Sequence, residues 1–171
     1  MTSSFPTIEP PDSFFLSAAA GWIELGVPME AELELMKLSP SLAAHPEVLE
    51  TRWLLCASQA NWDQGLAIAE QLCGLTPDTA GPWLHRAYAM RRASTGSIEK
   101  ALHILLNATL RFPEEATIPY NLACYTCQLD RLDEARRWLE IARQTGGKKA
   151  IQSLALRDND LQVLWAEIKA W

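Results

Sequence analysis

The sequence predicts an all-α fold built from antiparallel helix pairs. Apolar residues recur three and four positions apart along most of the chain, and no segment shows the period-two alternation of strands. The predicted helices are joined by short connections, which makes successive helices antiparallel neighbours. A small residue also recurs early in every second helix, so the pairs are copies of one unit.

Composition narrows the class of protein. The chain has 171 residues, 49% of them hydrophobic, which is enough for a sizeable core. Its net charge of −6 disfavours a partner gripped through phosphates, so we expect no nucleic-acid binding. No apolar run approaches the roughly 18 residues needed to span a bilayer, and we expect no membrane partner. The first residues lack the pattern of a secretory signal, so the cytoplasm is the expected compartment.

Prolines, glycines and polar caps mark the expected helix ends. Residues 1–11 contain three prolines and are predicted to be a flexible lead-in. Asp12 or Ser13 caps the first helix, and Gly26 ends it. Later helices start at capping residues or at prolines in the first turn, and Gly146-Gly147 ends the eighth. The expected helices span 12–25, 28–38, 47–59, 62–75, 82–93 and 98–111, with two more within 120–146.

The small residues set the repeat. Each lies about five positions into a second helix, and consecutive ones are 34, 36 and 34 residues apart. They are Ala31, Gly65, Ala101 and Ala135. A helix–turn–helix unit with a period near 34 indicates a repeat array whose pairs bury their apolar faces by stacking.

These residues resemble the tetratricopeptide repeat (TPR) family. The best match is the fourth unit, through Leu122-Ala123, Leu129, Ala135, Leu139 and Ala142. The resemblance implies a right-handed α-α superhelix of about four repeats over 12–147. Their approximate bounds are 12–45, 46–79, 80–115 and 116–147. Arg52 and Arg86 stand where the family usually has a buried leucine, which leaves the register of the second repeat open by about a residue.

The segment 148–171 is predicted to cap the array. Asp158 or Asn159 starts a last helix, whose apolar face would cover the open side of the fourth repeat. That face consists of Leu161, Leu164, Trp165 and Ile168. The motif at 156–161 also resembles the closing segments of some bacterial TPR proteins.

The family resemblance implies a binding groove lined by the first helix of each pair. Residues on that face of the predicted helices are Glu50, Leu84, Tyr88, Arg91, Arg92, Tyr120, Asn121, Cys124 and Gln128. Two tyrosines would be rigid anchors, and the arginine pair would hold a carboxylate or an acidic side chain. The alternative for Arg91-Arg92 is a solvated helix end favoured by the helix dipole.

Cys124 and Cys127 form a Cys-x-x-Cys motif in the middle of a predicted helix. A redox motif needs the helix N-terminus, where the dipole lowers the thiol pKa, and a zinc site needs further ligands at suitable spacing. All four cysteines fall within predicted helices and are expected to be free thiols that pack in the core. We therefore expect no metal, no cofactor and no catalytic constellation.

The sequence thus favours a non-catalytic interaction module that binds a peptide or helix of another protein in its groove. Two alternatives remain: a small cytoplasmic TPR chaperone of the secretion type, and a regulatory protein acting through Cys124 and Cys127. The chaperone would need a helical N-terminal dimerisation segment, which the prolines of 1–11 disfavour. A monomer and a homodimer are both compatible with the sequence.

Overall fold

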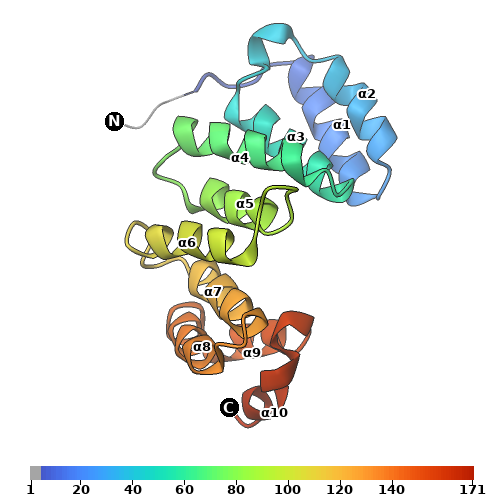
Figure 1. Cartoon of the computed structure of the whole chain (residues 1–171). Coiled ribbons are helices and arrows are strands. Elements are labelled where there is room, and N and C mark those ends of the chain that lie inside the picture. Colours follow the sequence, from blue (N-terminus) through green and yellow to red (C-terminus); the bar gives the residue numbers. More distant parts are fainter. Residues whose placement is uncertain (1–4) are drawn as a thin grey trace. The chain divides into compact units, whose positions relative to one another are not determined.

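The computed structural model describes residues 5–171, and the first four residues of the predicted lead-in lie outside this part. The chain divides into two compact units, one up to Thr95 and one over Gly96–Trp171 (Figure 1). Within the described residues all regular secondary structure is helical. None of the helices in this part is long and apolar enough to cross a bilayer.

The described residues of the first unit form five α-helices and one short 3-10 turn. They are α1 (Asp12–Glu24), α2 (Pro28–Met36), η1 (Pro40–Leu42), α3 (Pro46–Ser58), α4 (Trp62–Leu75) and α5 (Ala80–Met90). These bounds agree with the expected helices to within a few residues, and η1 is an addition. The expected role of Asp12 as a helix cap is wrong. Its carboxylate instead accepts bonds from the N–H and hydroxyl of Ser39, at 2.7 and 2.8 Å, and so secures the chain just after α2.

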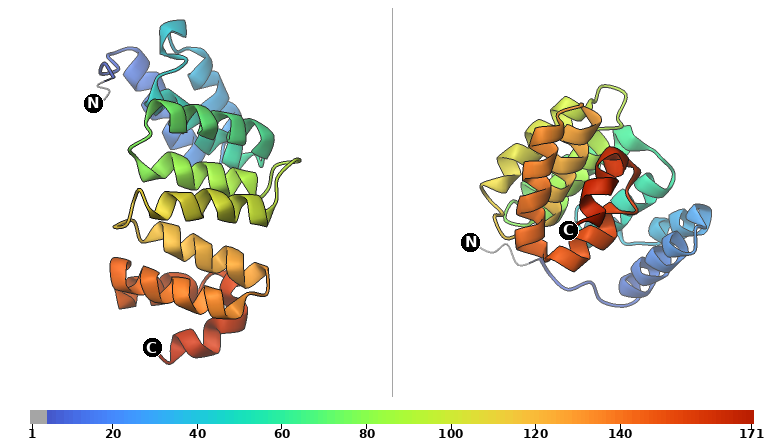
Figure 2. Two further views of the ribbon diagram at one scale, coloured as in Figure 1. Left: turned by 60° about the vertical axis from the view of Figure 1, so that its left-hand side comes forward. Right: turned by 90° about the horizontal axis from the view of Figure 1, so that it is seen from below.

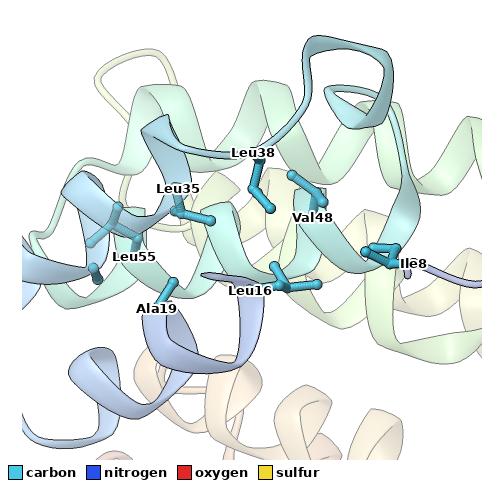
Figure 3. Packing of buried hydrophobic residues seen from close by; sticks show 8 residues of the cluster. Ile8, Leu16, Ala19, Leu35, Leu38, Val48 and Leu55 are labelled. Carbon is cyan, nitrogen blue, oxygen red and sulfur yellow. The ribbon is translucent and has the colours of Figure 1, made fainter. Parts of the chain in front are cut away.

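The core of this unit includes a residue from the predicted lead-in. Ile8 is buried in one cluster with side chains of α1 and α3, among them Leu16 and Val48 (Figure 3). Nearby, Nε2 of the buried His45 lies 2.9 Å from the carbonyl oxygen of Pro6. Residues 5–11 are therefore fastened to the folded unit by both apolar and polar contacts.

The second unit contains five α-helices and a 3-10 segment. They are α6 (Ile98–Thr109), α7 (Thr117–Gln128), α8 (Leu132–Gly146), α9 (Lys148–Ala155), η2 (Asn159–Leu164) and α10 (Trp165–Lys169). The expected single last helix is wrong, because the Asp158 side chain caps a 3-10 segment that precedes a short α-helix. The side chains of Leu161, Leu164 and Ile168 are buried as expected, and η2 packs on α7.

Helix α9 was not predicted from the sequence. The Gly146-Gly147 pair suggested a chain exit, but only Gly147 has a positive φ, at 86°, and α9 begins at the next residue. Gly146 has a packing role, because a Cβ there would lie 2.8 Å from the Cβ of Ala116. The two glycines turn the chain sharply from α8 into α9, which packs against α8 (Figure 2).

The repeat is visible in packing and in turns. Ala31, Ala101 and Ala135 have no exposed surface, as expected for close helix contacts. The turns after α1, α3 and α7 each contain one residue with a positive φ, and these residues are Gly26, Ala60 and Asp130. The same left-handed backbone conformation thus recurs in the turn after the first helix of three pairs.

Candidate peptide-binding surfaces

Helix α5 carries an aromatic and cationic cluster in the first unit. The Arg92 guanidinium lies 3.6 Å from the centroid of the Tyr88 ring and 5.3 Å from that of Trp62. Its Nη1 also donates a 3.0 Å hydrogen bond to the Tyr88 carbonyl. The Tyr88 side chain remains 39% exposed. Arg92 lies two residues past the end of α5, in a turn where its N–H donates a 2.9 Å hydrogen bond to the Ala89 carbonyl. This turn keeps its side chain over Tyr88, four residues earlier.

His85 connects this cluster to α3. Its ring stacks on Trp53 with a centroid distance of 3.7 Å and an interplanar angle of 15°. Its Nε2 lies 2.5 Å from Oε1 of Glu50, so a predicted groove residue is held by a histidine that the sequence analysis had not selected. The Trp53 side chain is buried. The available signal was the position of His85 one helical turn before Tyr88.

Beside Glu50 the first unit contains an open hollow of about 460 Å³. Its apolar wall comes from Leu16 and Ala20 of α1 and from Pro82 of α5. Glu47 and Glu50 of α3 give it an acidic edge. The hollow is large enough for a side chain of a peptide, and its edge favours a basic or uncharged one.

In the second unit the chain itself covers the corresponding face of α7. The Tyr120 hydroxyl donates a 2.9 Å hydrogen bond to Oδ2 of Asp158, and the Cys124 thiol approaches the same oxygen at 3.4 Å. Gln128 donates to the Asp160 carbonyl at 3.2 Å. Tyr120 and Cys124 are only 5% and 2% exposed. They therefore contact the chain's own C-terminal segment and not an open groove.

The other predicted groove residues have simpler surroundings. Leu84 and Arg91 are half-buried on α5, where Arg91 is the residue that ends the helix. Asn121 donates to the Thr117 carbonyl of its own helix at 2.8 Å. The open predicted side chains thus lie on α3 and α5 in the first unit, whereas those of α7 are largely engaged.

The Cys-x-x-Cys motif is in a setting that opposes thiol chemistry. Burial raises the pKa of the Cys124 thiol well above its usual range, and the Asp158 carboxylate raises it further. Burial also raises the pKa of Cys127, with Asp160 adding to the effect. Atoms of Cys124, Asp158 and Asp160 that could bind a metal ion lie within 4.8 Å of one another. The Asp158 carboxylate, however, already accepts a hydrogen bond from the Tyr120 hydroxyl. These groups are best explained as a hydrogen-bonded contact between α7 and η2.

Comparison with known proteins identifies the fold. No family model matches the sequence, and no curated protein matches it. Among solved structures, the thermophilic TPR protein TTC0263 from Thermus thermophilus is similar to this chain with a TM-score of 0.65 and 19% identity. The match covers 94% of this chain and 100% of that one. The chain therefore has a TPR fold, built from consecutive helix pairs.

Proposed function

We propose that this chain is a non-catalytic interaction module that binds an acidic peptide segment or a peptide carboxylate on the exposed face of α5. The observation that carries the proposal is the Arg92 guanidinium stacked on the half-open Tyr88 ring. Stacking restricts the flexible arginine before a ligand arrives, which lowers the entropy lost on binding. A planar guanidinium can then pair with a carboxylate through two parallel hydrogen bonds.

The second unit supports this assignment by analogy. With Ala87 aligned on Ala123, Tyr88 corresponds to Cys124 and Arg92 to Gln128. In α7 these two positions contact an acidic segment of the same chain, at Asp158 and Asp160. At the C-terminal end of α5 the same two positions hold an aromatic ring and a cation that stack on each other, and the ring is partly open to solvent.

The charges along the first unit also give the proposed peptide a direction. Glu47 and Glu50 flank the hollow, whereas Arg91 and Arg92 lie at the C-terminal end of α5. A peptide with an apolar or basic residue over the hollow and an acidic residue at Arg92 would complement the charge at both places. Reversing it would place like charges together, which costs binding free energy.

The two alternative functions gain no support. A thiol-based regulator needs an accessible thiol of low pKa, and Cys124 has the opposite properties. A secretion-type chaperone was expected to have a helical N-terminal segment, and residues 5–11 form no helix.

A peptide-display selection tests the proposal. A random library with free C-termini is selected on the wild-type protein, and enriched peptides are measured by fluorescence anisotropy. We expect acidic residues at one end of the consensus, and at least about tenfold weaker binding to the double variant Arg91→Glu, Arg92→Glu. The matched double variant Arg137→Glu, Arg157→Glu reverses two exposed charges in the second unit and should bind like wild type.

Two results would contradict the proposal. One is an enriched consensus without acidic residues. The other is equal weakening by both double variants, which would indicate a general charge effect. Helical circular dichroism confirms that each variant is folded.

A further inference from the structure

Helix α2 exposes an apolar stripe that the proposed peptide site does not use. Met29, Leu33 and Met36 are 67%, 51% and 76% exposed. They lie at positions i, i+4 and i+7, which share one face of a helix. Three large apolar side chains in one row differ from the isolated exposed residues that any protein surface has.

The stripe lies on the far side of α2 from the core. Ala31 and Leu35 are the buried residues of this helix, and at about 100° per residue they point roughly opposite to the stripe. Leu25 and Val27, in the turn before α2, are also exposed and extend the apolar surface toward α1. The helix is thus apolar on two faces, although only one of them is needed for folding.

The outer face is bordered by negative charge. The exposed residues Glu30 and Glu32 flank the stripe on its two sides. Glu34 neutralises Lys37 through an ion pair of 2.7 Å. The unpaired charges of Glu30 and Glu32 therefore make the border of the stripe acidic. Terminal units of a repeat array usually turn a polar face to solvent, so an apolar outer face on the first helix pair is a departure from the rule.

We propose that this stripe is a second interaction surface, which binds an amphipathic helix of another protein whose apolar ridge is flanked by lysine or arginine. Three anchors at i, i+4 and i+7 match the ridge of a helical partner. The acidic border selects a basic partner by charge complementarity. A second copy of this chain fits less well, because an antiparallel pairing of two α2 helices would bring the Glu32 side chains of the two copies together. This inference is independent of the α5 site.

The test uses a defined probe. A fluorescent synthetic amphipathic peptide has leucines at every third and fourth position and lysines on both sides, and its matched partner has glutamates in place of the lysines. Anisotropy titrations compare wild type with the variant Met29→Ser, Leu33→Ser, Met36→Ser. We expect the lysine peptide to bind at least about tenfold more weakly to this variant, because three apolar contacts are lost. The glutamate peptide should bind more weakly than the lysine peptide to wild type.

A control variant keeps the test specific. Leu110→Ser, Leu154→Ser, Val163→Ser makes the same kind of change at three exposed positions of the second unit and should leave binding unchanged. Equal weakening in both variants, or equal binding of the two peptides, would overturn the proposal. Sedimentation velocity tests whether the stripe instead binds a second copy of this chain. A wild-type dimer that dissociates in the α2 variant would show self-association through the stripe and would overturn the proposed partner.

Discussion

Helices α5 and α7 are the first helices of two predicted repeats but have different surroundings. The α7 face is closed, because Tyr120 and Cys124 both contact Asp158 of the C-terminal segment. The α5 face is open at Tyr88, which stacks with Arg92 and remains 39% exposed. One repeat thus receives an acidic segment from its own chain, and the other retains a cation and an aromatic ring at its surface.

The difference shows that position in a repeat does not by itself define a binding residue. Tyr120 would be judged a groove residue from its helix alone, yet its partner lies 38 residues further along the chain. A binding surface depends on which repeat faces remain uncovered once the segments outside the repeats have packed.

The largest effect is expected from weakening the cover on α7. Leu164 of η2 is buried, whereas its neighbour Val163 is exposed. Leu164→Ala should lower the free energy of unfolding by about 2–5 kcal/mol, because it leaves a cavity in the core. Val163→Ala should change it by less than about 0.5 kcal/mol. Urea denaturation measures both, and similar values for the two variants would show that η2 is not a stabilising cover.

The tyrosines of the two faces, which do not occupy equivalent positions, provide the next comparison. Tyr120→Phe removes the hydroxyl that donates a hydrogen bond to Asp158 and should lower the free energy of unfolding by about 1–3 kcal/mol. Tyr88→Phe should cost less than about 0.5 kcal/mol, because its side chain is partly solvated. Both values come from the same denaturation experiment. If Tyr88→Phe proved the more costly change, the contrast between the two faces would be reversed.

Alkaline pH should loosen the closed face. Burial raises the pKa of both the Tyr120 hydroxyl and the Cys124 thiol, and Asp158 adds to each. The folded protein keeps these protons at a pH where the unfolded chain releases them. The free energy of unfolding is therefore unaffected below pH 9.0, the ordinary pKa of a thiol, and falls as the pH rises above it.

Denaturation midpoints between neutral and alkaline pH check this dependence. Cys124→Ala removes one of the two groups, so its stability should fall less steeply with pH than that of wild type. The same slope in both proteins would show that the pKa of this thiol does not differ between the folded and unfolded states.

A small effect on folding is also expected at Arg92. Cation–π contacts at exposed sites contribute about 0.5–1 kcal/mol, so Arg92→Ala should lower the free energy of unfolding by no more than about 1 kcal/mol. The same variant should weaken binding of a selected acidic peptide. A large loss of stability would instead make Arg92 a structural residue.

Local signals in the sequence were sufficient for most of the fold. Helical periodicity, prolines and the recurring small residues predicted the helix pairs, and the buried Ala31, Ala101 and Ala135 confirm the pattern. Helix α9 was missed because Gly146 and Gly147 resemble a stop signal, although one is required by close packing and the other by its positive φ.

The candidate site was less accessible to sequence reasoning. Tyr88 and Arg92 could be chosen from their spacing on one helix. The stack of His85 on Trp53 joins two helices, and the contact of Tyr120 with Asp158 joins two segments far apart in the chain. Periodicity describes one helix at a time, so contacts of this kind emerge only from the packed structure.

The most direct test of the contrast between α5 and α7 is a titration of the labelled protein with a selected acidic peptide, followed by backbone amide chemical shifts. Our account predicts that the shifts concentrate on residues 84–92, with little change over residues 120–128. Shifts concentrated on residues 120–128 would contradict it, because they would require the peptide to displace the C-terminal segment from α7.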